Sequence, residues 1–519
     1  MMQKFGFDFG DPYYTFDGLQ FAFRVCTLEN VYGINPDTAT SSMTNGRLTI
    51  ETGGYQYAGG QKTCPGTLKA DIHKRDDGVC FHVKARHHEV IKGITILIRH
   101  LAAPDEEEQI YNWPTLDLNA PSFPHINTPD GTTSFILPDS TILRHRRWAV
   151  YREYSGKWVF NLTEDEAYTE QSHEMTGSQW TLLRDRDQHA VSGIWYGMLA
   201  KERGLRPWHE RSDIPEWFRE VSLVLNMHCE GWTGHVFNTF DRQLDILKWI
   251  ADRMDGRRVL VYLAGWDGRY YWNYPIYKPS TACGGEDGLF RMIEGAHKLG
   301  MHVVPMFGVI ASNYKNTKEM GFQKAVCRTA YDLEEICDWT GWDEDLATEP
   351  IWQPLNVGEA EFRQHLLHRI HSITDQFQTD GVVLDISGWL PKDPRHDLFN
   401  GLSQLIRNLQ QRYEDYLIFG ENGSDLHWSM IPFYHHGAHL KADHPFFTYC
   451  RTAYHLWQGA PGRGSTGVFE GGLNPYQALK VDNPAIPTLA IVQDTLSSHS
   501  DEMEKVIDMS MKWGDRWLS

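Results

Sequence analysis

The sequence predicts an α/β protein, in which a (β/α)8 TIM barrel follows an N-terminal all-β sandwich domain. Residues 1–238 contain short alternating or apolar runs between Gly, Asp and Pro residues, without helical periodicity. Residues 239–519 instead alternate short apolar runs with helical patterns, as βα units do. The 519 residues also exceed what one hydrophobic core usually serves. We therefore expect two domains, divided after residue 238.

The N-terminal half supplies the predicted strands of the sandwich. Strand-like runs include RLTIETGGYQY, GVCFHVKARHHEVIKGITILIRHL, WAVYREYSGKWVFNL and WTLLRDRDQHAVSGIWYGML. Each alternates apolar and polar residues, or stays apolar between turn residues. Many short strands without helical patterns between them are typical of two packed sheets.

The first barrel strands are predicted from residue 259 onward. Val259–Ala264 is the first strand, and Met301–Phe307 is the second, after a helix that begins near Glu286. The stretch from about 311 to 358 is too long for a plain connection. We expect it to contain the third strand and a functional loop.

The later strands follow the same pattern. Val382–Leu384 is the predicted fourth strand and Leu417–Phe419 the fifth, with an amphipathic helix between them. SMIPFYHH, STGVFEGG and IPTLAIVQD are candidates for strands six, seven and eight, before a closing helix around Met503–Trp513. Eight candidate strands suit one barrel.

Composition limits the function classes. A net charge of −19 repels polyanions, so we expect neither nucleic-acid nor membrane partners. The eight cysteines are scattered without a CxxC pair, as is typical of reduced thiols. With no export segment visible, we expect a cytoplasmic protein. The 19 Trp and 23 Tyr residues offer flat rings on which sugars stack. Whether the chain forms a homo-oligomer stays open.

Carboxylates follow two neighbouring predicted strands. Asp385 comes directly after the fourth strand, and Glu421 comes after the fifth. In a parallel barrel both side chains face the same mouth, and neighbouring strands lie about 4.8 Å apart. A retaining glycosidase needs two carboxyl groups about 5–5.5 Å apart. We therefore interpret Asp385 as nucleophile and Glu421 as acid/base, although an Asp or Glu after a strand also forms ordinary caps and turns.

Four motifs resemble the endo- and exo-α-N-acetylgalactosaminidases and their uncharacterised relatives. GWDGRYYWNYPIYKPS and GGEDGLFRMIEGAHKLGMHVVPMFGVIASN look like the first two βα units of that barrel type. DGVVLDISG is similar to its nucleophile strand, and FGENGSD to its acid/base strand. The order of an Asp on strand four and a Glu on strand five also resembles the wider α-amylase-like barrels. The resemblance covers roughly residues 250 to 500.

The resemblance implies a retaining α-glycosidase with Asp385 and Glu421 as its catalytic pair. It also implies that the N-terminal domain is a supersandwich of the mutarotase-like type. No extra carbohydrate-binding module is visible in the sequence, which favours an oligosaccharide or small glycoside over a glycoprotein. No residue matches one that reads an acetamido group, so α-N-acetylgalactosaminide, α-galactoside and α-glucoside all stay open as substrates.

Further residues are expected to contact the sugar. Aromatic and polar side chains at strand ends either stack on sugar rings and bond hydroxyls, or pack in the core and form turns. The candidates are Trp266, Asp267, Tyr270, Asn313, Trp389, His435, His436 and Asp494.

No metal or other cofactor is expected, because a retaining hydrolase needs none. The histidines near residues 435–444 are read as loop structure or sugar contacts, since their spacing matches no closed zinc site. Two other functions stay open: an inverting hydrolase or transglycosidase on the same barrel, and a non-catalytic carbohydrate-binding protein.

Overall fold

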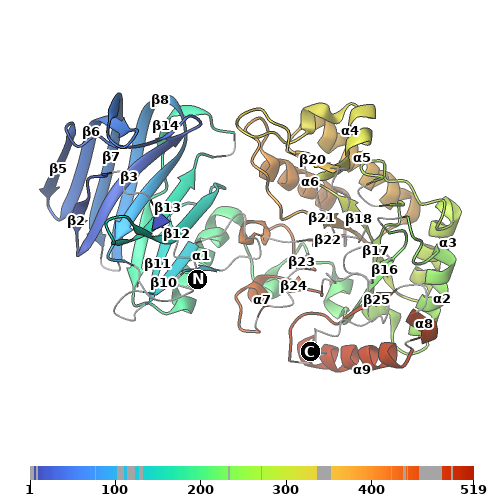
Figure 1. The fold of residues 1–519 in the computed structure, drawn as a ribbon. Coiled ribbons are helices and arrows are strands. Elements are labelled where there is room, and N and C mark those ends of the chain that lie inside the picture. The colour runs from blue at the N-terminus through green and yellow to red at the C-terminus, as the bar shows by residue number, and fades with distance from the viewer. Residues whose placement is uncertain are drawn as a thin grey trace. The chain divides into compact units, whose positions relative to one another are not determined.

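The computed structural model describes residues 5–6, 10–75, 78–101, 110–113, 123–127, 133–167, 169–231, 234–269, 272–335, 352–421, 424–435, 440, 442–454, 482–491, 495–498 and 500–518. The chain divides into two units (Figure 1). Unit 1 comprises residues 1–205 and 424–426, and unit 2 comprises residues 206–423 and 427–519.

Unit 1 is built on a 15-stranded sheet, in which every strand pair is antiparallel except β1 with β12. The longest path of paired strands runs β2-β3-β4-β6-β7-β8-β15-β11-β10-β9. The strands are β1 (Phe5–Gly6), β2 (Tyr14–Phe16), β3 (Leu19–Thr27), β4 (Val31–Ile34), β5 (Ala39–Thr44), β6 (Arg47–Tyr57), β7 (Lys62–Arg75), β8 (Gly78–Arg99), β9 (Ile110–Trp113), β10 (Phe123–Asn127), β11 (Thr133–Pro138), β12 (Arg146–Glu153), β13 (Trp158–Asp165), β14 (Ser172–Thr176) and β15 (Trp180–Arg184). One helix, α1 (Gln188–Arg203), follows them.

Alternating apolar residues explain how this sheet forms its core. Where β7 and β8 pair, buried side chains alternate with more exposed ones, such as Leu68, Ala70 and Ile72 on one strand and Phe81, Val83 and Ala85 on the other. A period of two places these side chains on one face of the sheet. They join a single apolar cluster with buried residues of β3, β6, β13 and β15.

Unit 2 contains an eight-stranded parallel sheet, in the order β24-β23-β22-β21-β18-β17-β16-β25. Its strands are β16 (Leu223–His228), β17 (Val259–Ala264), β18 (His302–Gly308), β21 (Gly381–Asp385), β22 (Leu417–Gly420), β23 (Phe433–Tyr434), β24 (Arg451–Thr452) and β25 (Thr488–Ile491). Six of the eight strands are buried along their whole length, as parallel strands covered on both faces are. The protein is therefore a mixed α/β protein with one large antiparallel sheet and one parallel sheet.

Helices connect the parallel strands. They are α2 (Phe240–Ala251), α3 (Gly285–Lys298), α4 (Tyr314–Glu319), α5 (Ala360–Phe377), α6 (Leu398–Arg412), α7 (Phe446–Tyr449), α8 (Thr495–Ser498) and α9 (Ser500–Trp517). Short 3-10 helices lie at Trp208–Glu210, Glu216–Glu220, Gly256–Arg258, Phe322–Ala325 and Asp425–His427. In Figure 1, α2 and α3 lie side by side beside β16 and β17.

The sequences of the helices explain where each helix begins and which of its side chains are buried. Thr239 accepts a hydrogen bond from the Arg242 amide and caps α2, while Asp397 does the same for the Asn400 amide at the start of α6. Along α6, the buried residues recur at spacings of three and four, so that one stripe faces the sheet.

Two expectations about the parallel strands need correction. The first strand is β16, which lies before the expected division after residue 238 yet pairs with β17. The stretch from 311 to 358 adds no strand to the parallel sheet, because β18 pairs directly with β21. Its two described strands, β19 (Ala311–Asn313) and β20 (Trp352–Pro354), instead pair with each other. The expected seventh strand, STGVFEGG, lies outside the described residues and stays a prediction.

The two edge strands of the parallel sheet are linked at one point. An isolated parallel bridge joins Ala453, next to β24, with Ile486, ahead of β25. The Ile486 amide donates to the Thr452 carbonyl at 2.8 Å. Among the described helices, none has the length and apolar character that a membrane span requires.

Candidate active site

The parallel register brings four strand ends to one level. Gly308 of β18 pairs with Asp385 of β21. Leu384 pairs with Gly420, and Gly420 with Tyr434, so Glu421 and His435 follow at the same height. Because the strands are parallel, the residues after each of them emerge at the same edge of the sheet.

Asp385, Glu421 and His435 meet at this edge. One ligand atom from each, a carboxylate oxygen or an imidazole nitrogen, lies within 4.8 Å of the other two. Asp385 is 4% exposed and His435 is 2% exposed, while Glu421 is half-buried. The structure thus brings together three of the residues that the sequence singled out.

Local hydrogen bonds hold Glu421 beside Asp385. The Ile386 amide donates to Glu421 Oε2 at 2.7 Å. The Ser387 hydroxyl donates to the Glu421 carbonyl at 2.9 Å and accepts from the Glu421 amide at 3.1 Å. The two strand ends are therefore tied by side chain and backbone together.

The turn after Asp385 has an unusual backbone. Ile386 has a φ of 59°, in the left-handed region that a β-branched residue rarely adopts. A non-glycine residue held there costs on the order of 1–3 kcal/mol, and such residues gather at functional sites. The turn is what aims the Ile386 amide at the Glu421 carboxylate.

Asp267 follows β17 and is almost entirely buried. It is 4% exposed, and neither carboxylate oxygen has a hydrogen-bond partner among the described residues. Burial raises the pKa of Asp267 well above its ordinary value, and the charge of Glu230 raises it further. A carboxyl group in this state has unused capacity to donate to and accept from a hydroxyl group.

Two tyrosines line the same edge of the sheet. The Tyr277 hydroxyl donates to the Gly308 carbonyl at 2.7 Å, and the Tyr274 ring packs on Gly308, where a Cβ would lie 2.2 Å from Tyr274 Cε2. Burial raises the pKa of Tyr277, and the charges of Asp267 and Asp385 raise it further. Tyr277 is therefore close enough to feel the charge of both acids.

The other predicted contact residues lie in different settings. Trp266 is fully buried, and its indole donates to the Met306 carbonyl at 2.8 Å. Trp389 is half-buried, with its ring 5.8 Å from that of Trp352. Asn313 caps α4 by accepting from the Lys315 and Asn316 amides. Tyr270, His436 and Asp494 lie outside the described residues. For all of these, contact with a sugar stays a prediction.

Sequence reasoning missed three residues of this region. Ser387 forms hydrogen bonds with the carbonyl and the amide of Glu421. Tyr277 feels the charges of Asp267 and Asp385. Glu230 accepts a hydrogen bond from the Ser280 hydroxyl at 2.7 Å, and its charge raises the pKa of Asp267. A hydroxyl two residues after the strand-end Asp was a usable signal for Ser387, because such positions form turns with side-chain hydrogen bonds.

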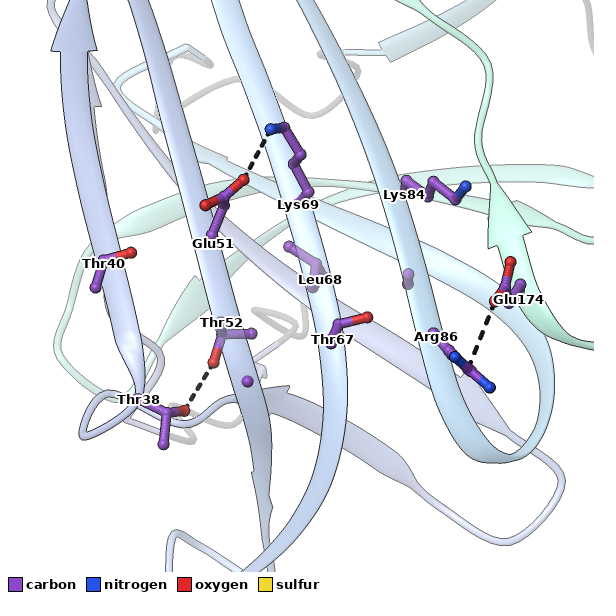
Figure 2. A pocket seen from close by; sticks show the side chains of 12 residues that line it. Thr38, Thr40, Glu51, Thr52, Thr67, Leu68, Lys69, Lys84, Arg86 and Glu174 are labelled. Atoms are coloured by element: carbon purple, nitrogen blue, oxygen red, sulfur yellow. Dashed lines mark hydrogen bonds and ion pairs between the residues drawn. The ribbon is translucent and has the colours of Figure 1, made fainter.

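A hollow lies in unit 1, on the face of β5, β6, β7, β8 and β14. Its volume is about 570 Å³. Figure 2 shows that both of its carboxylates pair with cations: Glu51 with Lys69 at 2.7 Å, and Glu174 with Arg86 at 3.5 Å. With both carboxylates paired to cations, this hollow lacks the two facing acids of the parallel sheet.

No protein-family model and no curated protein matches this sequence. Solved structures do match its fold. The α-N-acetylgalactosaminidase NagBb from Bifidobacterium bifidum, in complex with GalNAc, has a TM-score of 0.65 at 11% identity, covering 98% of this chain and 94% of that one. The same enzyme in complex with Gal-NHAc-DNJ has a TM-score of 0.67 at 11% identity, covering 98% and 93%.

Two α-galactosidases match less well. The galactosidase domain of the α-galactosidase–sucrose kinase AgaSK has a TM-score of 0.50 at 14% identity, covering 96% of this chain and 72% of that one. A GH36 α-galactosidase, AgaA from Geobacillus stearothermophilus in complex with raffinose, has a TM-score of 0.50 at 9% identity, covering 96% and 74%. The predicted resemblance to α-N-acetylgalactosaminidases is thus confirmed at the level of the fold.

Proposed function

We propose that this protein is a retaining glycoside hydrolase that removes a terminal α-linked sugar. Asp385 is the nucleophile and Glu421 the acid/base. The observation that carries this proposal is the approach of the two carboxyl groups to within 4.8 Å at the ends of neighbouring parallel strands. Retaining glycosidases hold their carboxyl groups about 5–5.5 Å apart, whereas inverting ones need about 6.5–9.5 Å to admit a water.

The reaction follows from this spacing. Asp385 attacks the anomeric carbon while Glu421 gives its proton to the departing oxygen, which leaves a glycosyl ester on Asp385. Glu421 then takes a proton from water, and the water oxygen attacks the same carbon from the face that the leaving group vacated. Two inversions restore the original configuration.

The surroundings of Glu421 suit both of its roles. In the free enzyme, the neighbouring charge of Asp385 favours the protonated acid. Once Asp385 is esterified that charge is gone, and the hydrogen bond from the Ile386 amide favours the carboxylate that the second step needs. One side chain thus serves as acid and then as base.

Asp267 is the best candidate for reading the sugar. Its two buried oxygens have no hydrogen-bond partner among the described residues, and a pair of sugar hydroxyls would satisfy them. We propose His435 and Trp389 as further contacts to the sugar, beside the reacting carbon. The solved structures with the same fold are α-N-acetylgalactosaminidases and α-galactosidases, so α-galactosides and their 2-acetamido analogues are the first substrates to test.

We also propose the finer architecture. The bridge between Ala453 and Ile486 supports closure of the parallel sheet into a (β/α)8 barrel. The folding of the 15-stranded sheet into two layers around one apolar cluster would make unit 1 the expected sandwich. The seven described cysteines are all free thiols, which supports a cytoplasmic location.

A panel of aryl α- and β-glycosides at neutral pH tests the activity. We expect hydrolysis of α-glycosides by the wild type and by Asp508→Asn, a control that removes an exposed acid on α9. Asp385→Asn should lose turnover with its fold intact. Glu421→Gln should retain more activity on activated aryl leaving groups than on alkyl ones. Full activity of Asp385→Asn would refute the assignment.

Two measurements separate the proposal from its alternatives. A mechanism-based fluorosugar should label Asp385, and proton NMR should show the α-anomer as first product. Initial β-anomer would indicate an inverting hydrolase, while transfer to added alcohol without hydrolysis would indicate a transglycosidase. Binding of an α-glycoside with no turnover in any assay would favour a non-catalytic sugar-binding protein.

A further inference from the structure

A cluster of three potential metal ligands, one thiol and two imidazoles, lies in unit 1. The strand-end acids Asp385 and Glu421 belong to unit 2. Cys64 belongs to β7, and His87 and His88 belong to β8. The paired registers of β7 and β8 end at Gly66 opposite His87. Next to this point the pairing of β8 with β14 shifts, between Ser172 and Glu174.

This irregularity explains why two consecutive histidines face one site. Side chains of successive residues in a regular strand point to opposite faces of the sheet. A bulge adds a residue and re-aims the side chains beside it. The rings of His87 and His88 accordingly lie side by side instead of pointing to opposite faces, with centroids 4.3 Å apart and planes tilted by 33°.

The three side chains have the spacing of metal ligands. One ligand atom each from Cys64, His87 and His88 lies within 4.8 Å of the other two, and Cys64 Sγ is 3.5 Å from His87 Nε2. Tetrahedral zinc has bonds of about 2.3 Å to sulfur and about 2.0–2.1 Å to nitrogen, which places its ligand atoms roughly 3.3–3.8 Å apart. Small side-chain rotations therefore bring all three atoms to zinc distances.

The exposures allow an ion to enter. His87 is 2% exposed, Cys64 is half-buried, and His88 is exposed. Tyr32 and Tyr55 form an aromatic wall behind His87, with ring centroids 4.3 and 5.3 Å away. The site is thus closed on the core side and open on the solvent side.

Glu89 supplies a nearby negative charge. Its carboxylate lies 3.9 Å from His87 Nδ1 and 3.6 Å from His88 Nε2. The Thr27 and Tyr32 hydroxyls donate to Glu89 Oε2 at 2.7 and 2.9 Å and hold the carboxylate in place. A thiolate and this carboxylate together balance the charge of a divalent cation.

We propose that Cys64, His87 and His88 bind a thiophilic divalent cation, Zn²⁺, with Glu89 beside it. A sulfur and two imidazoles select zinc over Mg²⁺ and Ca²⁺, which prefer oxygen ligands. Binding releases the thiol proton of Cys64. In the free protein the Glu89 amide donates to His87 Nδ1 at 3.1 Å, so the imidazole proton is on Nε2. For Nε2 to bind zinc, the ring proton must move to Nδ1. The Glu89 amide then gives up its hydrogen bond to Nδ1, and Nδ1–H instead donates a hydrogen bond to the Glu89 carboxylate, which lies 3.9 Å away in the free protein.

The site differs from the expectation of no metal, which concerned the hydrolytic reaction. Zinc here would tie β7 and β8 where their pairing ends, and would stabilise the folded state by mass action. The ion would have no part in glycoside cleavage.

The experiment uses the full chain, treated with chelator and titrated with Zn²⁺ and separately with Co²⁺. We expect one equivalent of Zn²⁺ per chain by metal analysis after desalting, and a sulfur-to-cobalt charge-transfer band in the near ultraviolet. Cys64→Ser should abolish the band, and His88→Ala should weaken Zn²⁺ binding at least tenfold. Both residues are solvent-accessible, so both variants should fold.

Matched controls in the same unit are Cys26→Ser, which removes another half-buried thiol, and His173→Ala, which removes another exposed imidazole. Both should keep the Zn²⁺ stoichiometry and the cobalt band. The proposal is overturned if the wild type binds no Zn²⁺, or if Cys64→Ser retains the cobalt band. Binding lost in Asp385→Asn and kept in Cys64→Ser would assign the ion to the strand-end acids instead.

Discussion

Replacing Ser387 by alanine tests the hydrogen bonds that hold the candidate acid/base. The Ser387 side chain is fully buried, and its hydroxyl binds the carbonyl and the amide of Glu421 at 2.9 and 3.1 Å. Both groups keep another partner after the change: the carbonyl accepts from the Gly388 amide at 3.0 Å, and the amide donates to Leu384 at 3.3 Å. Neither group is therefore left unsatisfied.

The expected cost follows from this count of bonds. Two net hydrogen bonds at about 0.5–1.5 kcal/mol each lower the free energy of unfolding of Ser387→Ala by about 1–3 kcal/mol. Urea denaturation measures this loss, and an unchanged m-value would show that stability alone has changed. We also expect a fall in kcat/KM of about tenfold, or ~1.4 kcal/mol, that is larger for alkyl than for aryl leaving groups.

Ser403→Ala is the matched control for this change. Ser403 is also a buried serine, and its hydroxyl donates to the Phe399 carbonyl at 2.7 Å within α6. Alanine has the higher helix propensity, which offsets part of the lost bond, so stability should change by less than about 1 kcal/mol. If Ser387→Ala is as stable and as active as Ser403→Ala, the two bonds to Glu421 do not matter and our reasoning is wrong.

Three further changes test other parts of unit 2. Asp267→Asn should raise the melting temperature at neutral pH and lower kcat/KM, because burial makes ionisation of Asp267 costly; a lower melting temperature would contradict this. Gly308→Ala should destabilise by about 1–3 kcal/mol in urea denaturation, since the new Cβ collides with Tyr274, whereas unchanged stability would contradict the packing. Hydrogen bonds from His297 and His302 outweigh burial and lower the pKa of Asp380. The stability that Asp380 contributes is therefore present above its ordinary pKa of 3.8 and lost as pH falls, a decline that Asp380→Asn should lack in pH-dependent melting.

The sequence was most informative where strands are buried and short. The runs ending at Asp385 and Glu421 are apolar, and their strand assignments are confirmed, because a buried parallel strand leaves a continuous apolar run. The proximity of the two acids followed from neighbouring strands, and the structure brings them within 4.8 Å.

The errors have physical causes. β16, with the sequence LVLNMH, follows β-rich segments and so was assigned to the sandwich, although its register with β17 places it in the parallel sheet. The length of the stretch from 311 to 358 suggested a third strand, but length cannot distinguish a barrel strand from the separate β19–β20 pair. Tyr277 acts through contacts across the fold, which no local pattern encodes. Ser387 was missed although its position two residues after Asp385 was a local signal.

Four residues lie at one level of the parallel sheet: Gly308, Asp385, Glu421 and His435. This common level determines which changes in sequence leave the proposed site intact. Under the proposed mechanism, lengthening the segments that follow these residues would alter which aglycone is admitted and would leave the two carboxyl groups where they are. Inserting one residue within β21 or β22 would instead turn an acid from the interior toward the helices. Changes in the loops can thus alter substrate preference, whereas the number of residues in each of these strands must stay the same.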